Sequence, residues 1–294
     1  MGYLFIFLSV ISNAAKGACS KFVSEDISTA KQNIFFNLVR NLFCTVIAFA
    51  MVLVLDGGKN LAVQPIEIFL SGLSGAAMAI FTFSWMFAVK SDAYMLVNAC
   101  NSASFVVPCI FGFALLGEKL TVYKLISFVI ILLALYFLLK HNLKLKGKIT
   151  LAQGIMLFLI FLTTGTYQAM QKIYAVTVTD KDISYYTFYT FAVSTVILLV
   201  ATLFFRKETA CDSRGIVRKN FLFLTVMAIG NFASTYFQSI AAKTVDSIIL
   251  YPVFNALILI AGGVVSTVFF KEKFTKSCLV GLILVFVALI LSSY

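Results

Sequence analysis

The chain alternates long apolar runs with short polar stretches, and this pattern recurs from one end to the other. Most runs reach or approach the roughly 20 residues that a helix needs to cross the hydrocarbon core of a membrane. A helix satisfies its own backbone hydrogen-bonding groups in lipid, so it is the element expected for each run. The ten predicted spans are residues 3–22, 34–55, 66–89, 94–116, 121–139, 152–174, 184–205, 220–242, 247–270 and 277–293. The pattern therefore predicts an all-α integral membrane protein of ten transmembrane helices, without a separate soluble domain.

The second half of the chain repeats the layout of the first. The stretch GEKLTVYKLISFVIILLAL aligns with KEKFTKSCLVGLILVFVAL near the C-terminus, and the same register pairs Asn101 with Asn255. The residue identity is low, so the repeat rests mainly on layout, with five spans in residues 1–140 and five in 150–294. Because five is odd, the second unit enters the membrane in the opposite direction to the first. Many transporters are inverted repeats of this kind and bind substrate near the bilayer midplane between the repeats.

Polar residues inside the spans fall on single helical faces. In the first span Ser9, Ser12, Asn13, Lys16 and Ser20 follow the i, i+3, i+4, i+7 spacing that places residues on one side of a helix. Eight spans carry such a stripe, whereas the fifth and tenth are apolar nearly all round. The simplest arrangement puts the eight striped helices around a polar cavity. The other two then lie outside it, as lipid-facing scaffold or a subunit contact.

The stripes supply the candidate substrate-binding residues. They are Asn13, Lys16, Asn37, Arg40, Trp85, Asn98, Asn101, Tyr167, Gln168, Tyr189, Asn231, Gln238, Tyr251 and Asn255. Asn101 and Asn255 occupy equivalent positions in the two halves, which favours a shared role. Each other amide has a second interpretation, because Asn and Gln also hold membrane helices together. Trp85 and Tyr189 either stack on a ligand or anchor their helices at the membrane interface.

Two cations lie well inside the first two predicted spans, Lys16 and Arg40. A charge at the bilayer centre costs about 2.5–3.5 kcal/mol on the lenient insertion scale, so each needs water or a partner. Lys16 either faces the cavity or extends its ammonium towards the headgroups. Arg40 either contacts substrate or ties helices together. No Asp or Glu lies in the middle of any span, which favours zwitterionic, carboxylate or phosphorylated solutes over cationic drugs.

Composition agrees with a membrane protein, since 61% of the residues are hydrophobic and only 12% are charged, against about 25% charged in soluble domains. The net charge of +11 does not indicate nucleic acid, because the cations concentrate in the connections, as they do on the cytoplasmic side of membrane proteins. The single histidine, His141, and the six cysteines form no ligand cluster, so we expect no metal and no cofactor. The sequence holds no GxxxxGK[ST], HExxH or GxSxG motif, which argues against an enzyme.

The chain resembles the drug/metabolite transporter superfamily, in its ten-span EamA-like branch. The resemblance rests on the duplicated five-span unit, on the turn LLGEKL and its repeat FFKEKF, on SNAAKGACSK in the first span, and on Arg40 in the second. Two features depart from the family pattern: Ile11 and Ser12 replace a common Trp-Gly pair, and the proline of the ninth span lies at its start, at Pro252. The resemblance implies a secondary transporter that moves a small organic metabolite by alternating access.

We therefore expect efflux or exchange of small polar or anionic metabolites such as amino acids. The alternatives are a flippase for a lipid-linked sugar or phosphate and a non-transporting membrane sensor or scaffold. The expected partners are a small-molecule substrate and the lipid bilayer, with no nucleic acid, and the protein is expected to be a monomer or homodimer in the cell (inner) membrane, multi-pass.

The loop charges and the resemblance disagree about orientation. Lysine and arginine concentrate in the connections after spans five, seven and nine, which lie on the side of the membrane opposite both termini. The positive-inside rule makes these loops cytoplasmic and the termini external. The resemblance implies termini in the cytoplasm.

Overall fold

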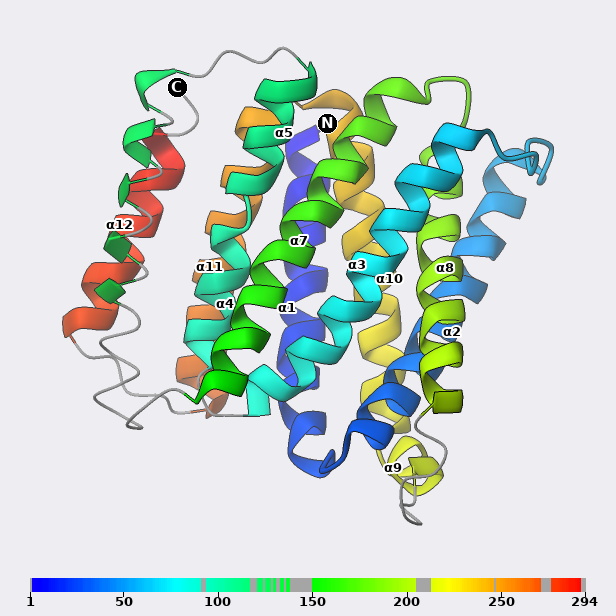
Figure 1. The fold of residues 1–294 in the computed structure, drawn as a ribbon, viewed down its shortest axis with the longest axis horizontal. Coiled ribbons are helices and arrows are strands. Elements are labelled where there is room, and N and C mark those ends of the chain that lie inside the picture. The colour runs from blue at the N-terminus through cyan, green and yellow to red at the C-terminus, as the bar shows by residue number, and fades with distance from the viewer. Residues whose placement is uncertain are drawn as a thin grey trace.

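The computed structural model describes residues 2–90, 94–116, 121–123, 125–127, 129–130, 133–134, 136–137, 150–204, 213–245, 247–270 and 276–291. Every regular element in these ranges is an α-helix, as predicted (Figure 1). The helices are α1 (Gly2–Asp26), α2 (Ala30–Asp56), α3 (Pro65–Lys90), α4 (Tyr94–Ala103), α5 (Val106–Leu116), α7 (Leu151–Thr177), α8 (Ile183–Phe204), α9 (Ser213–Lys219), α10 (Phe221–Thr244), α11 (Ser247–Phe270) and α12 (Lys276–Leu291).

Seven described segments are long and apolar enough to cross a membrane, where the sequence predicts ten. They are α1, α2, α3, the joined α4–α5 segment, α7, α8 and α10. Two further apolar stretches, Leu250–Val265 in α11 and Leu279–Ala288 in α12, are shorter. Of the predicted fifth span, 121–139, the structure describes residues 121–123, 125–127, 129–130, 133–134 and 136–137. The helices thus describe a multi-pass membrane protein.

The two halves run through the molecule in opposite directions. α1 begins beside the end of α10, since a β-carbon on Gly2 would touch the side chains of Thr244 and Val245. α7 instead ends there, because the Lys172 ammonium near its C-terminus donates to the carbonyls of Ala242 and Val245 at 3.1 and 2.9 Å. In Figure 1, α1 starts at the upper end of the molecule and α7 starts at the lower end.

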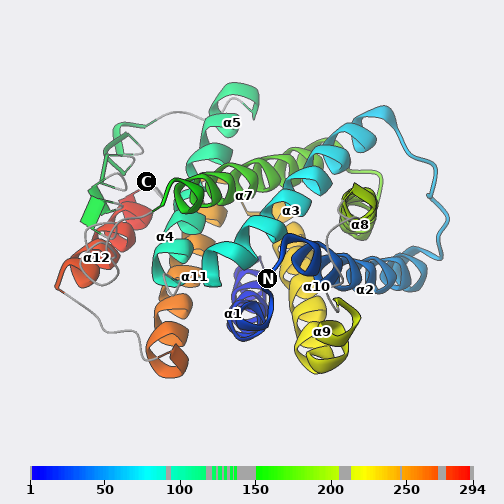
Figure 2. The ribbon, with the colours of Figure 1, turned by 60° about the horizontal axis from the view of Figure 1, so that its bottom comes forward.

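Contacts between the halves come in exchanged pairs. In the repeat, α1 corresponds to α7 and α3 corresponds to α10. Each of these helices packs against the partner of the other pair from the opposite half: α1 lies along α10, and α3 lies along α7. α2 packs along α8, its own equivalent, and α4 contacts α11 in the same way. Figure 2 shows these neighbours from a second direction. Two inverted copies packed around a common axis produce this exchange, so most of the interior is an interface between the halves.

One glycine permits the close approach of α1 and α10. A β-carbon at Gly230 would lie 2.8 Å from the carbonyl oxygen of Ser12 and 3.4 Å from the β-carbon of Lys16. Small residues at such crossings let membrane helices pack by direct backbone contact. The crossing fixes the depth at which Lys16 enters the interior.

Buried lysines complete the ends of two equivalent helices. Lys21 of α1 donates to the Val89 carbonyl at the end of α3, at 2.8 Å. Lys172 of α7 makes the matching contacts at the end of α10. The last carbonyls of a helix have no partner within the helix and carry partial negative charge, so a lysine there is stabilising.

An ion pair joins the halves at each end of the molecule. At the upper end, Glu67 in the first turn of α3 lies 2.8 Å from the Lys181 ammonium, and their side chains are 0% and 6% exposed. At the lower end, Lys219 lies 2.8 Å from Asp26, with side chains 68% and 29% exposed. The two pairs occupy similar places in the repeat. Glu67 lies at the start of α3 and Lys181 follows α7, while Lys219 lies just before α10 and Asp26 ends α1. The upper pair is thus buried and the lower pair is open to solvent.

α12 lies at the edge of the molecule against α11 (Figures 1 and 2). Its residues Leu279, Ile283 and Phe286 are exposed. This position agrees with the expectation that the tenth span lies outside the cavity.

Candidate functional site

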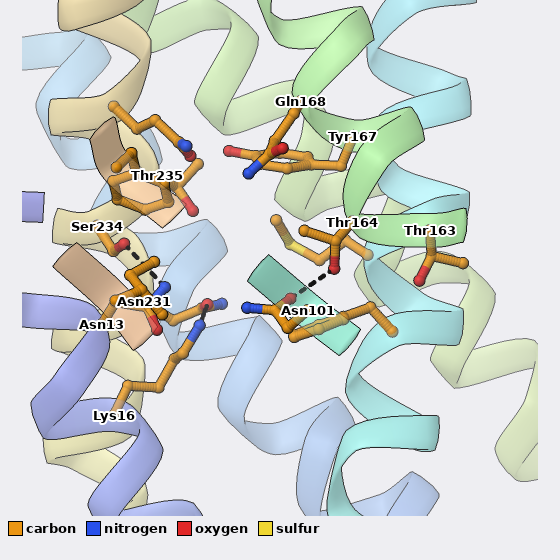
Figure 3. A pocket seen from close by; sticks show the side chains of 15 residues that line it. Asn13, Lys16, Asn101, Thr163, Thr164, Tyr167, Gln168, Asn231, Ser234 and Thr235 are labelled. Atoms are coloured by element: carbon orange, nitrogen blue, oxygen red, sulfur yellow. Dashed lines mark hydrogen bonds between the residues drawn. The ribbon is translucent and has the colours of Figure 1, made fainter. Parts of the chain in front are cut away.

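A cavity of about 540 Å³, counting the space at its mouth, lies between the two halves (Figure 3). Its lining comes from six helices, three from each half: α1, α3 and α4, and their equivalents α7, α10 and α11. The residues belong to the middle turns of these helices, with Asn101 at the break between α4 and α5. The lining residues are Asn13, Lys16, Met78, Phe81, Asn101, Thr163, Thr164, Tyr167, Gln168, Asn231, Ser234, Thr235, Gln238, Phe254 and Ile258.

The wall formed by α1 and α10 carries the positive charge. The Lys16 ammonium donates to Asn231 Oδ1 at 3.3 Å and lies 5.7 Å from the centre of the Phe81 ring. One turn away, Asn13 Nδ2 donates to Ser234 Oγ at 3.4 Å. These contacts bring together residues 215 or more positions apart in the chain, and they set the side chains along one edge of the cavity (Figure 3).

The wall formed by α4 and α7 is polar but uncharged. The Thr164 hydroxyl donates to Asn101 Oδ1 at 2.8 Å across the two helices. Asn101 is held there by the break that follows it, where Ser104 and Phe105 form a turn and Pro108 lies in the first turn of α5. Proline has no backbone N–H, so it cannot continue the backbone hydrogen bonds of a helix. Broken helices of this kind supply binding sites at the midplane of many transporters.

Two buried amide atoms of the lining have no hydrogen-bond partner among the described residues. They are Oε1 of Gln168 on α7 and Nε2 of Gln238 on α10. Burying an unpaired polar group costs about 1–3 kcal/mol. A solute with hydroxyl or amide groups would supply the missing partners, so these atoms are suited to ligand binding.

Half of the fourteen candidate residues line this cavity. The seven lining residues are Asn13, Lys16, Asn101, Tyr167, Gln168, Asn231 and Gln238. The other seven lie outside the lining, and their role in binding stays a prediction.

Three of the outlying candidates contribute to packing between α1, α2 and α3. Asn37 Nδ2 donates to the Thr82 carbonyl at 3.3 Å, and the indole Nε1 of Trp85 donates to the Ser20 hydroxyl at 2.8 Å. Arg40 is 3% exposed and its Nε has no partner in the described structure. Trp85 therefore joins α3 to α1 by this hydrogen bond and is not among the residues that line the cavity.

Three others support the lining from behind. The Tyr251 hydroxyl donates to the Gln168 carbonyl at 2.7 Å, and Asn255 Oδ1 accepts from Gln168 Nε2 at 3.4 Å. Asn98 of α4 packs closely on Gly262 of α11. Asn101 thus lines the cavity, whereas Asn255, its equivalent in the repeat, bonds a residue of the lining.

The stripes of α2 and α8 face other helices, so six helices line the cavity rather than the expected eight. Thr45 and Thr195 bond across this pair at 3.0 Å. The remaining candidate, Tyr189 of α8, donates to the Leu61 carbonyl at the upper end of the molecule, at 3.2 Å. Tyr189 is not among the residues that line this cavity, and its role in binding stays a prediction.

The candidate set omitted eight lining residues. They are Met78, Phe81, Thr163, Thr164, Ser234, Thr235, Phe254 and Ile258. Thr164, Ser234 and Thr235 lie on the same helical faces as the chosen residues, so helical spacing alone could have predicted them. The apolar members give no such signal, because an apolar residue facing a cavity looks like any other in a membrane helix.

A multi-pass helical protein with a polar cavity between two inverted halves has the architecture of a secondary transporter. The model of the EamA-like transporter family matches residues 1–140 and 151–294. The chain therefore belongs to the EamA-like transporter family, whose members are membrane transporters, in agreement with the resemblance to the drug/metabolite transporter superfamily.

The fold is shared with solved structures. One chain, described as "Crystal structure of protein", superposes with a TM-score of 0.70 over 99% of this chain and 95% of its own, at 10% sequence identity. At that identity the likeness shows the fold alone. No curated protein matches the sequence.

Proposed function

We propose that the protein is a secondary transporter that moves small polar or anionic metabolites, amino acids among them, across the cell (inner) membrane by alternating access, in efflux or exchange. In this proposal the chain has ten transmembrane helices in two inverted five-helix repeats, with the predicted fifth span and α12 at the periphery. The small solute and the bilayer are its partners, and the chain acts as a monomer or homodimer.

The cavity lined by equivalent helices from both halves carries the proposal. A site on the axis between inverted repeats contacts each repeat in the same way, so a rocking motion can open it to either side of the membrane. The polar lining at the middle turns suits a hydrated solute. The unpaired amide atoms of Gln168 and Gln238 give the solute hydrogen bonds that the protein leaves open.

The ties at the two ends support alternation. The Glu67–Lys181 pair joins the halves at the upper end and the Asp26–Lys219 pair joins them at the lower end. For the cavity to open towards one end, the ion pair at that end has to break. The burial of the upper pair and the exposure of the lower pair favour a conformation held more firmly at the upper end.

The test combines binding and transport. The purified protein is screened by thermal shift against amino acids, carboxylates and phosphorylated metabolites at millimolar concentration, where a ligand stabilises by RT ln(1 + [L]/Kd). Each solute that raises the melting temperature is then tested for counterflow in proteoliposomes without ATP. We expect at least one solute to bind and to accumulate against its unlabelled form.

Three results would contradict the proposal. Binding without counterflow would favour a sensor. Movement of a lipid-linked sugar or phosphate without movement of free solutes would favour a flippase. If no solute in the screen binds and none is transported, the interpretation as a non-transporting scaffold would be favoured.

A further inference from the structure

We infer that the cavity recognises its substrate by a single anionic group, a carboxylate or phosphate, bound at Lys16, while an uncharged polar part of the substrate faces α4 and α7; the buried Arg40 of α2 supplies a second positive charge. This inference rests on the proposed function and specifies the substrate class. A substrate must carry the anionic group in order to bind, whereas an ammonium group on the substrate is not required.

Lys16 differs from the other buried lysines of the spans. Lys21 and Lys172 each donate to carbonyls at the end of a helix, which accounts for their charge. Lys16 lies in the middle of α1 and lines the cavity, where its one hydrogen bond within the described structure goes to the neutral Asn231. An ammonium has three donors. The two that remain are available to a ligand.

Asn231 is itself held in place. Its Nδ2 lies 3.8 Å from Cys44 Sγ on α2, and that thiol donates to the Ala228 carbonyl at 3.4 Å. The amide therefore presents Oδ1 towards Lys16 from a fixed position between α2 and α10. This arrangement orients the ammonium before a ligand arrives, which lowers the ordering cost of binding.

Arg40 adds a second positive charge that forms no ion pair with the acidic residues that the structure describes. It lies one turn from Cys44 on α2 and is almost fully buried. The residues lining the cavity include no carboxylate. The acidic residues in the described ion pairs, Glu67 and Asp26, lie at opposite ends of the molecule. A positive charge held in a low-dielectric interior raises the energy of the empty site, and an anion next to Lys16 offsets that cost.

The far wall defines the rest of the substrate. Thr164, Asn101 and the unpaired Oε1 of Gln168 offer neutral donors and acceptors to the cavity. Phe81 and Phe254 contribute apolar surface between the walls. The site therefore fits a small molecule with an anion at one end and hydroxyl or amide groups at the other.

The experiment compares molecules that differ only in charge. Binding of lactate against lactamide, and of glycerol 3-phosphate against glycerol, is measured by calorimetry or thermal shift on wild type, Lys16→Met, Lys16→Arg, Arg40→Met and Lys59→Met. Lys59 is exposed in the α2–α3 connection, so its replacement removes the same charge without touching the cavity.

We expect the wild type to bind at least one of the two anions. It should bind the neutral analogue of that anion about 10- to 100-fold more weakly, because a hydrogen bond to a charged group contributes a factor of that size to affinity. Lys16→Met removes this preference, Lys16→Arg keeps most of it, and Arg40→Met reduces it. Lys59→Met behaves as wild type. If Lys16→Met fails to fold, the wild-type preference and the Lys16→Arg result still decide the matter.

Two results would overturn the inference: equal binding of the charged and neutral analogues by wild type, or an unchanged anion preference in folded Lys16→Met. Transport of neutral solutes alone would overturn it and leave the proposed function intact, whereas no transport at all would remove the proposed function. Short-chain phosphatidylglycerol forms a further arm. If it binds in a Lys16-dependent way and glycerol 3-phosphate does not, the anion is a lipid headgroup; the reverse identifies a free solute.

Discussion

The buried Glu67–Lys181 pair provides a prediction whose size follows from the structure. At 2.8 Å the two charges attract by about 6 kcal/mol at an effective dielectric constant of about 20. Desolvation of both groups offsets much of this attraction. Glu67 also accepts from the Gln64 amide at 2.7 Å and from the Tyr174 hydroxyl at 3.2 Å, so its carboxylate is fixed by three donors from different segments.

Lys181→Met leaves the Glu67 carboxylate buried with only neutral donors. Removing one partner of a buried pair costs about 3–5 kcal/mol, and we expect that loss in the free energy of unfolding. The double variant Glu67→Gln/Lys181→Met retains the shape without either charge and should lose far less, about 0–2 kcal/mol. Lys219→Met, which breaks the exposed pair at the lower end, is the matched control and should cost no more than about 1 kcal/mol.

The assay is equilibrium unfolding in mild detergent, followed by tryptophan fluorescence and helical circular dichroism, and analysed as a double-mutant cycle. The reasoning is refuted if Lys181→Met costs less than the Lys219→Met control, or if the double variant is as unstable as the sum of its single variants. Either result would mean that water reaches the pair and that the upper tie holds the halves only weakly.

Three further predictions concern packing and orientation. Gly230→Ala should destabilise the protein by about 1–3 kcal/mol, because the new methyl group meets the backbone of α1. Gly72→Ala is the control and should not destabilise it, because a β-carbon there meets nothing within 4 Å. Thermal unfolding distinguishes the two variants. Lys172→Met should cost about 1–3 kcal/mol in the same measurement, because it leaves carbonyls at the end of α10 without this donor. In a cysteine-free background, Ser213→Cys should be shielded from an impermeant maleimide in intact cells and Asn60→Cys should react, as the loop charges predict; the reverse labelling would show the family orientation.

Hydrophobic length and the inverted repeat could be predicted from the sequence because both depend on the order of residues along the chain. The membrane environment requires helices of a fixed length, and an odd number of spans per repeat fixes their direction. The exchanged packing of α1 with α10 and α3 with α7 follows from that symmetry. The split of the fourth span after Ala103 was not predicted, although Pro108 gave a local signal for it.

The candidate site could be predicted only by face, because helical periodicity says which residues share a side and not what that side meets. The stripes of α1 and α2 are alike in sequence. The first turns Lys16 and Asn13 into the cavity, while the second turns Asn37 towards the Thr82 carbonyl of α3. A polar stripe that binds a neighbouring helix has the same period as one that binds a solute. Tertiary contacts decide between them.

The central claim is that the cavity between the halves is the transport site, and a matched pair of threonines tests it most directly. Thr164 lines the cavity and bonds Asn101, whereas Thr202 of α8 lies outside the lining and bonds the Leu198 carbonyl of its own helix at 2.8 Å. Thr164→Leu places an apolar group in the cavity and removes a donor, and Thr202→Leu makes the same chemical change elsewhere.

The measurement is the initial rate of counterflow in proteoliposomes, for a solute that the wild type carries, with equal amounts of folded protein in each sample. We predict that Thr164→Leu lowers the rate at least about tenfold, the factor that corresponds to about 1.4 kcal/mol, while Thr202→Leu stays near the wild-type rate. Equal rates for the two variants would contradict the claim that this cavity carries the solute.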